Sequence, residues 1–217
     1  MKILLLGKNG QVGWELQRAL APLGEVIALD RNGMNQWSGD LTQPDQIYQT
    51  ILELSPDVVV NASAYTAVDM AERDQETADL VNHQAVKKIA NACAETGALF
   101  VHYSTDYVFN GAGQLAFNEA DVVEPLNVYG KTKALGEQVI QNSKCHHLIF
   151  RTSWVFAQRG KNFLKTMLAL AHQREELSII DDQIGAPTSA ELIADVSVHA
   201  IIQTLQDPTK IGIYQLV

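Results

Sequence analysis

A short apolar run, a glycine-containing turn and a helical pattern open this chain, and their order constrains the fold more than any other feature. Residues 2–6 are the apolar run, residues 7–13 read Gly-Lys-Asn-Gly-Gln-Val-Gly, and residues 14–20 have helical spacing. Glycines at such a turn let the backbone approach a pyrophosphate, and a helix N-terminus offers free N–H groups and a positive dipole end. The spacing is wider than Gly-x-Gly-x-x-Gly, so an ordinary strand-to-helix turn is an equal alternative for this stretch alone.

Strand and helix patterns alternate along the rest of the chain. We expect further strands at residues 25–30, 57–61, 98–102, 147–156, 177–180 and 211–217. Helical patterns cover residues 44–54, 67–96, 125–137 and 162–172, and a last one follows residue 188. Strands that alternate with helices at this spacing predict a parallel sheet with crossover helices on both faces. The predicted fold class is therefore α/β, a Rossmann-type doubly wound parallel sheet.

Composition excludes several classes of function. The 217 residues carry a net charge of -9, which argues against a nucleic-acid partner. The longest apolar runs are far shorter than the roughly 20 residues that span a bilayer, so we expect no membrane partner. Cys93 and Cys145 have no metal-ligand or disulfide spacing and are expected to be reduced thiols of a cytoplasmic protein.

Candidate cofactor contacts follow the predicted strands. Asp30 ends the second strand, where an acid accepts a hydrogen bond from an adenosine ribose 2′-hydroxyl and favours NAD. Arg31 and Lys8 are placed to meet a 2′-phosphate instead, and a plain polar strand end is a third interpretation. Small residues after the third strand allow close approach of a cofactor. The full set of candidates is Gly7, Gly10, Gln11, Val12, Gly13, Asp30, Arg31, Gly39, Asp40, Leu41, Ala62, Ser63, Ala64, Tyr65, Tyr129 and Lys133.

Tyr129 and Lys133 are the candidate catalytic pair. They are four residues apart in a helical pattern, so their side chains share one face. A nearby ammonium favours the phenolate, so we expect Lys133 to lower the pKa of Tyr129 towards the working pH. Thr105, after the fourth strand, is placed to hydrogen-bond a substrate carbonyl. The alternatives are a solvated helix face for the pair and a helix cap for Thr105.

These motifs together resemble the extended short-chain dehydrogenase/reductase superfamily. Within it, five segments closely resemble the dTDP-4-dehydrorhamnose reductase family, and they span the whole chain. The segments are the glycine turn, Tyr-Ser-Thr-Asp-Tyr-Val-Phe-Asn-Gly at 103–111, Pro-Leu-Asn-Val-Tyr-Gly-Lys-Thr-Lys at 125–133, Arg-Thr-Ser-Trp-Val-Phe at 151–156 and Asp-Gln-Ile-Gly-Ala-Pro-Thr at 182–188.

The resemblance implies reduction of dTDP-4-dehydro-L-rhamnose to dTDP-L-rhamnose with NADPH or NADH, in a pathway to cell-surface sugars. Thr105 then orients the C4 carbonyl, Tyr129 donates the proton, and Lys133 holds the nicotinamide ribose. Asp106 and Trp154 are implied substrate contacts, although Trp154 is equally compatible with a core position. The family is also associated with Mg²⁺ and with homodimers, and Glu15 and Glu191 are the acids to examine for a metal.

The resemblance also implies an organisation for the chain. Residues 1–155 are expected to form the NAD(P)-binding Rossmann core, and residues 156–217 to continue it with the start of the substrate-binding region. Family members continue beyond the length of this sequence. We therefore expect cofactor affinity to be retained and binding of the dTDP-sugar to be weakened.

Three alternatives compete with simple reduction. A sugar-nucleotide dehydratase uses a Thr-Asp-Glu triplet, whereas here Tyr107 follows Asp106, so the acid pair is missing. An epimerase of another sugar nucleotide differs in how its pocket lets a ketone rotate, which the sequence does not show. A non-catalytic NADP-binding regulator, similar to the regulatory subunit of methionine adenosyltransferase, is opposed by the intact Thr105, Tyr129 and Lys133.

Overall fold

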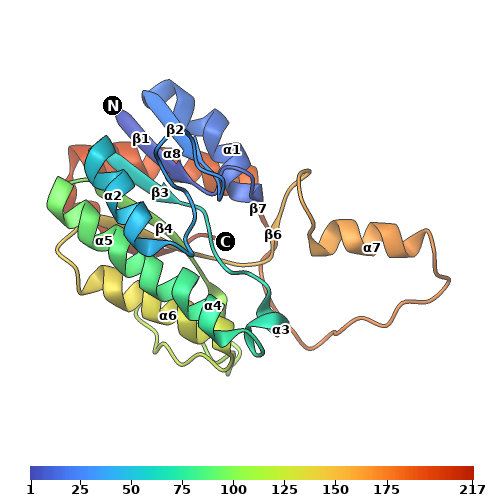
Figure 1. Cartoon of the computed structure of the whole chain (residues 1–217). Coiled ribbons are helices and arrows are strands. Elements are labelled where there is room, and N and C mark those ends of the chain that lie inside the picture. Colours follow the sequence, from blue (N-terminus) through green and yellow to red (C-terminus); the bar gives the residue numbers. More distant parts are fainter.

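A six-stranded parallel sheet forms the centre of the molecule in the computed structural model, which describes all residues 1–217 (Figure 1). The strands lie in the order β2-β1-β3-β4-β5-β8, and each pairs in parallel with its neighbours. Their bounds are Lys2–Leu6 (β1), Glu25–Leu29 (β2), Val58–Asn61 (β3), Leu99–Thr105 (β4), His147–Thr152 (β5) and Gly212–Gln215 (β8). The predicted doubly wound parallel sheet is confirmed.

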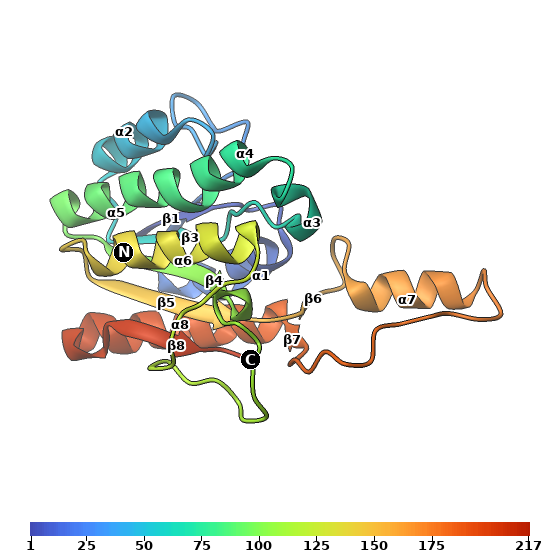
Figure 2. The same cartoon turned by 90° about the horizontal axis from the view of Figure 1, so that it is seen from below.

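Helices cover both faces of this sheet (Figures 1 and 2). One face carries α1 (Gln11–Leu20) and α8 (Ala190–Gln206), which pack against each other. The other face carries α2 (Pro44–Leu54), α5 (Ala85–Thr96) and α6 (Val128–Gln141). Two separate apolar clusters result, one on each face, because the strands between them are buried on both sides.

Residues 67–96 are helical as predicted, but the helix is not continuous. It consists of α3 (Val68–Ala71), α4 (Gln75–Asp79), a π-helical turn at Leu80–Gln84 and α5. The backbone carbonyl of Met70 accepts bonds from the N–H groups of Arg73 and Asp74, which ends α3. The π-helical turn places Asn82 where its side chain bonds both the backbone N–H and the carbonyl oxygen of Tyr65, at 2.9 and 3.0 Å. This contact fixes the segment that follows β3.

Two predicted strands differ from the structure by more than small shifts of their ends. The fifth ends at Thr152, and a bend at Ser153 and Trp154 separates it from the two-residue strand β6 (Val155–Phe156), which pairs with β7 (Thr188–Ser189). The strand predicted at 177–180 is wrong. Those residues pair with no strand, because they lie outside the sheet in an extended segment where Ile179 and Ile180 are exposed.

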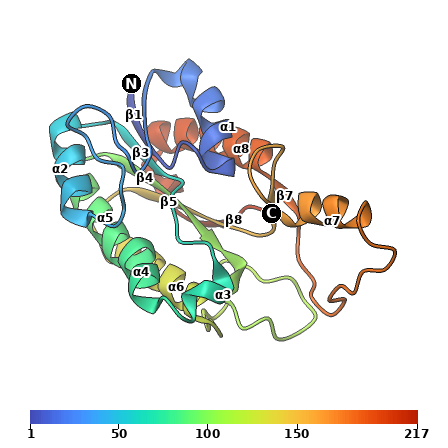
Figure 3. The ribbon, with the colours of Figure 1, turned by 45° about the vertical axis from the view of Figure 1, so that its right-hand side comes forward.

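That segment belongs to an arm, which we define as residues 157–187. The arm projects from the β6–β7 end of the molecule and carries α7 (Phe163–Ala171), as Figures 2 and 3 show. No residue of α7 is buried. No helix of the chain, α7 included, combines the length and the apolarity that a membrane crossing requires.

Candidate active site

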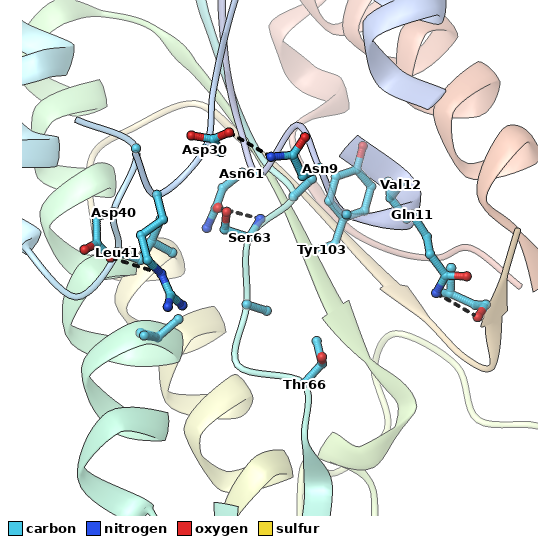
Figure 4. A pocket seen from close by; sticks show the side chains of 18 of the residues that line it. Asn9, Gln11, Val12, Asp30, Asp40, Leu41, Asn61, Ser63, Thr66 and Tyr103 are labelled. Carbon is cyan, nitrogen blue, oxygen red and sulfur yellow. Dashed lines mark hydrogen bonds and ion pairs between the residues drawn. The ribbon is translucent and has the colours of Figure 1, made fainter. Parts of the chain in front are cut away.

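A cavity of about 510 Å³ opens at the carboxyl ends of β1, β2, β3 and β4 (Figure 4). In a doubly wound sheet, ligands bind at this edge where the strand order reverses, and here the reversal lies between β1 and β3. The cavity joins most of the residues predicted from sequence. These are Gly7, Gly10, Gln11, Val12, Asp30, Arg31, Gly39, Asp40, Leu41, Ala62, Ser63, Ala64, Tyr129 and Lys133.

The glycine turn forms one wall of the cavity. Gly7 has φ +89°, a conformation that L side chains rarely adopt, and a Cβ at Gly13 would overlap the carbonyl oxygen of Gly7. Gly13 therefore brings α1 against the turn and does not itself line the cavity. Gly10 precedes α1 without a side-chain cap, so the first N–H groups of the helix are free to bind an anion. The turn therefore fits a pyrophosphate.

Asp30 lies directly after β2, beside the glycine turn. The Asn9 amide donates to its Oδ2 at 2.7 Å, and the backbone N–H of Asn32 donates to its Oδ1 at 2.9 Å. Burial acts to raise the pKa of Asp30, but these bonds and Lys8, at 3.6 Å, outweigh burial and lower it. Arg31 is 80% exposed, with its Nε 3.8 Å from Asp40. The part of the cavity around Asp30, where an adenosine ribose is expected, thus combines the carboxylate of Asp30 with the cations of Lys8 and Arg31.

Tyr129 enters the cavity from the first turn of α6. Asn127 caps this helix, because its Oδ1 accepts the backbone N–H of Gly130 at 2.7 Å. A Cβ at Gly130 would overlap the carbonyl oxygen of Tyr107, so only glycine allows α6 to begin this close to the turn at residues 106–108 that follows β4. Burial raises the pKa of Tyr129 to about 12, and a hydrogen bond with Thr105 opposes the increase. The phenol is therefore protonated at neutral pH.

The predicted effect of Lys133 on Tyr129 is wrong in this structure. Lys133 is 1% exposed, and its Nζ lies 2.6 Å from the carbonyl oxygen of Tyr103 and 3.2 Å from Nε2 of His102. Burial lowers the pKa of Lys133 itself to about 8. The amine contacts β4 instead of the phenol, so desolvation dominates the pKa of Tyr129. A phenol with pKa about 12 is still a stronger acid than water, at ~15.7, or an alcohol.

Thr105 acts both as a cap and as a neighbour of the phenol. Its Oγ1 accepts the backbone N–H of Tyr107 at 3.2 Å and donates to Asp106 Oδ1 at 3.0 Å. The cap interpretation of Thr105 is confirmed, and its hydrogen bond to a substrate carbonyl stays a prediction. Burial raises the pKa of Asp106, and the hydrogen bond from Thr105 opposes this. Neither residue lines the cavity directly, but each lies at the edge of the sheet where Tyr129 stands.

Tyr65 and Trp154 also lie outside the cavity wall. The hydroxyl of Tyr65 turns towards α4 and donates to Asp74 at 3.3 Å. Trp154 is not a core residue, since it is 43% exposed and has φ +43°, an uncommon backbone conformation for a bulky side chain. A Cβ at Gly185 would overlap its indole, so the arm packs directly against this ring.

Sequence reasoning missed several polar residues of the site. Ser104 Oγ and Thr152 Oγ1 are buried, line the cavity and have no hydrogen-bond partner. Unpaired buried hydroxyls are rare, and each calls for a partner such as a water or a ligand. The sequence signal that could have identified them is their place at strand ends. Ser104 directly precedes Thr105 at the end of β4, and Thr152 directly follows Arg151 at the end of β5. The other missed lining residues are Asn9, Asn32, Thr42, Asn61, Thr66, Val81, Tyr103 and Val155.

The suggested Mg²⁺ ligands, Glu15 and Glu191, belong to no metal-binding group in the structure. Glu15 pairs with Arg18 at 3.6 Å on α1, and Glu191 lies in the first turn of α8. No group of three or more His, Cys, Asp or Glu side chains is placed to hold a metal ion. The structure thus gives no support to the expected Mg²⁺.

The doubly wound sheet, the glycine turn at its reversal point and the Tyr129–Lys133 helix define a Rossmann-type protein of the short-chain dehydrogenase/reductase class. The family model described as the RmlD substrate binding domain matches residues 1–217. A dTDP-4-dehydrorhamnose reductase of Salmonella typhimurium is 56% identical over 217 residues, which are 100% of this chain and 72% of the relative. The chain therefore belongs to the dTDP-4-dehydrorhamnose reductase family.

Solved structures agree with this assignment. The dTDP-4-dehydrorhamnose reductase of Clostridium acetobutylicum superposes with a TM-score of 0.90 at 36% identity, covering 100% of this chain and 74% of that one. The Bacillus anthracis enzyme, solved in complex with NADP, superposes with a TM-score of 0.89 at 34% identity, covering 99% and 73%.

Proposed function

We propose that this chain reduces the 4-keto group of dTDP-4-dehydro-L-rhamnose to dTDP-L-rhamnose with a hydride from a nicotinamide dinucleotide. One observation carries the proposal: the pyrophosphate-fitting glycine turn and the protonated phenol of Tyr129 open into the same cavity. The membership of the family and the unpaired hydroxyls of Ser104 and Thr152 support it. The bound dinucleotide supplies the hydride that reaches the carbonyl carbon.

In this proposal, the residues of the chain supply the proton and the orientation. As the carbonyl carbon gains the hydride, its oxygen becomes an alkoxide, and the phenolic O–H of Tyr129 donates the proton. Thr105, which contacts the Tyr129 hydroxyl, orients the carbonyl oxygen towards that O–H. Tyr129 is half-buried and lines the cavity, so its O–H is accessible to a ketone bound there.

We further propose that both NADPH and NADH bind. Asp30 offers an oxygen to a 2′-hydroxyl, while Lys8 and the exposed Arg31 flank the same position and attract a 2′-phosphate. The NADP complex of the Bacillus anthracis enzyme supports the phosphate part of the proposal. At one salt concentration, Arg31→Ala is expected to weaken NADPH binding about tenfold and NADH binding little, because one exposed ion pair is lost. Equal effects on both cofactors would remove Arg31 from this role.

The arm and Trp154 are proposed to begin the substrate-binding region. Trp154 presents an exposed indole beside the catalytic edge, and aromatic rings stack on sugars and bases. Trp154→Ala is therefore expected to raise KM for the dTDP-sugar with little change in cofactor affinity.

The direct test is NADPH oxidation in the presence of dTDP-4-dehydro-L-rhamnose, with product identified by NMR. We expect oxidation only with the ketosugar, and none with dTDP-L-rhamnose in its place. Tight NADPH binding without any oxidation would instead favour the non-catalytic regulator. Conversion of the ketosugar to a second ketosugar, without loss of NADPH, would favour an epimerase.

A further inference from the structure

A buried row of hydrogen bonds connects the segment after β3 with the catalytic lysine. The backbone N–H of Ser63 donates to Asn61 Oδ1 at 3.0 Å, as Figure 4 shows. The Nδ2 of Asn61 lies 3.3 Å from Nδ1 of His102, and the Nε2 of His102 lies 3.2 Å from Nζ of Lys133. Asn61, His102 and Lys133 are each about 1% exposed, and Asn61 and Lys133 line the cavity.

The donors in this row determine the protonation of His102. Ser63 offers a backbone N–H, which cannot change role, so Asn61 must present its oxygen to Ser63 and its NH₂ to the imidazole. Nδ1 of His102 therefore accepts, and the single proton of the neutral ring sits on Nε2. A doubly protonated ring is excluded, because Nδ1–H would face the NH₂ of Asn61.

The proton on Nε2 in turn determines the form of Lys133. An N–H at Nε2 needs an acceptor, and an ammonium has none, whereas an uncharged amine has one lone pair. The amine still donates one N–H to the carbonyl oxygen of Tyr103 at 2.6 Å. Only a neutral His102 and an uncharged Lys133 satisfy every group in the row.

Electrostatics are compatible with this assignment above the midpoint of Lys133. Burial lowers the pKa of Lys133 to about 8, although Glu137 on the same helix raises it. Glu137 is itself paired with Arg151 of β5, with Nη2 2.6 Å from Oε2. Burial, followed by Lys133, lowers the pKa of His102 well below its usual range. The remaining titratable neighbour is Tyr129, one turn earlier on α6.

We propose that His102 is a positioning residue that holds Lys133 against β4 as an uncharged amine once the lysine has lost its proton. Ser63 and Asn61 fix the tautomer of His102. When Lys133 takes up a proton and becomes an ammonium, its side chain moves away from the His102 ring. The meaning of this switch for catalysis rests on the proposed reductase function. The hydrogen-bond assignment does not, and it can be tested without cofactor or substrate.

The first experiment measures the tautomer directly. ¹⁵N-histidine spectra distinguish a ring protonated on Nε2 from one protonated on Nδ1. His147 serves as a control within the same molecule, because its Nδ1 donates to the carbonyl oxygen of Cys145 at 3.1 Å and so carries the proton. We expect His102 and His147 to show opposite tautomers above the midpoint of Lys133. A proton on Nδ1 of His102 would overturn the proposal.

The second experiment reverses the direction of the hydrogen bonds between residue 61, His102 and Lys133. Asn61→Asp replaces the NH₂ with a carboxylate oxygen, which accepts from Nδ1, moves the ring proton there and leaves Nε2 as an acceptor for an ammonium. The Lys133 titration is followed by ¹³C-lysine NMR in the wild type, Asn61→Asp, His102→Phe and the double variant. In the His102→Phe background, the new carboxylate still acts on Lys133 directly, but the imidazole is absent. Comparing the shift of the Lys133 midpoint in the two backgrounds therefore separates the effect of the charge from the effect of the imidazole.

We expect Asn61→Asp to raise the Lys133 midpoint by at least about one pH unit more with His102 present than with Phe, as one hydrogen bond corresponds to about this shift. Equal increments in the two backgrounds would show that the ring does not determine the form of the lysine. Should a variant not fold, the wild-type tautomer measurement decides alone. Normal NADPH oxidation together with the wrong tautomer would refute this inference and leave the proposed function standing.

Discussion

Leucine side chains are buried on the helices that pack on the sheet but exposed on the helix of the arm. On α1, Leu16 is fully buried against the sheet, whereas Leu164 and Leu168 on α7 are 50% and 57% exposed. The α7 sequence is nonetheless rich in leucine, methionine and phenylalanine. Helix propensity and an asparagine cap at Asn162 are enough to form α7, but nothing in the chain covers it.

This difference separates the chemistry of the molecule from the recognition of its substrate. Tyr129, Lys133 and the glycine turn all stand on elements that pack on the sheet, so their geometry is fixed by two apolar clusters. The arm contacts the site through its base, where Asn162 Nδ2 donates to Gln11 Oε1 at 2.9 Å, Arg159 Nε donates to the carbonyl oxygen of Asn9 at 3.4 Å, and Gly185 lies against Trp154. We define the sheet half as the sheet with the helices packed on it. We expect changes in the sheet half to affect turnover and stability, and changes at the exposed leucines of α7 to affect neither stability nor cofactor binding.

Tyr129→Phe should give the largest effect and locate the chemistry in the sheet half. Loss of the proton donor is expected to lower kcat by roughly 10²–10⁴-fold. Cofactor affinity should change little, because the aromatic ring remains in the cavity wall. Steady-state kinetics and calorimetry with NADPH measure the two quantities, and an unchanged kcat would remove Tyr129 from its role.

Glu137→Gln should have the next largest effect, on stability. It leaves Arg151, 2% exposed, as an uncompensated buried charge, which typically costs about 3–5 kcal/mol of the free energy of unfolding. Urea denaturation measures the loss. The matched control replaces both residues with methionine and should recover most of it, because a well-packed apolar pair needs no counter-ion. A single variant as stable as the wild type would contradict the structural importance of the pair.

A pair of identical substitutions tests the comparison itself. Leu16→Ala in α1 should cost about 2–5 kcal/mol of the free energy of unfolding, because it opens a cavity in a filled core. Leu168→Ala in α7 should cost less than about 0.5 kcal/mol, as for other surface positions. The helix propensity change is the same in both, so packing alone accounts for the difference. Comparable losses would show that the arm is packed in solution.

A pH dependence of stability also arises in the sheet half. The pKa of Lys133 is about 8 in the folded protein and ~10.4 for a free lysine. Between these values the unfolded chain binds a proton that the folded chain does not. The free energy of unfolding should thus rise with pH, by up to about 1.4 kcal/mol per unit. The difference between the wild type and Lys133→Met, measured at pH 8 and at pH 10, isolates this contribution, and a flat difference would contradict the assigned pKa.

The sequence predicted the sheet half well because its signals are local. Helix α2 has the predicted bounds 44–54, and the cavity collects the glycine turn, Asp30 and Tyr129 from separate strands and helices. The helix bounds follow from the spacing of apolar residues. The gathering of the site residues follows from the rule that the carboxyl ends of parallel strands lie at the same edge of the sheet. Alternation could not reveal that residues 177–180 pair with no strand, since pairing depends on which neighbour is present.

The protonation of the site was the least predictable part. Spacing places Lys133 beside Tyr129, but the direction of its Nζ depends on the carbonyl oxygen of Tyr103 and on His102. In the sequence, His102 is one more residue of an apolar strand. Only the register of β3 with β4, which places Asn61 beside His102, gives it a role.

The most direct test of the account follows the hydride. NADPH carrying deuterium at the transferable position of nicotinamide C4 is incubated with the protein and dTDP-4-dehydro-L-rhamnose, and the sugar is analysed by NMR. Convergence of both ligands on Tyr129 predicts one deuterium per product, bound to C4 of the rhamnose. Product without deuterium, or with the label on another carbon, would contradict the arrangement of cofactor, carbonyl and phenol on which the account depends.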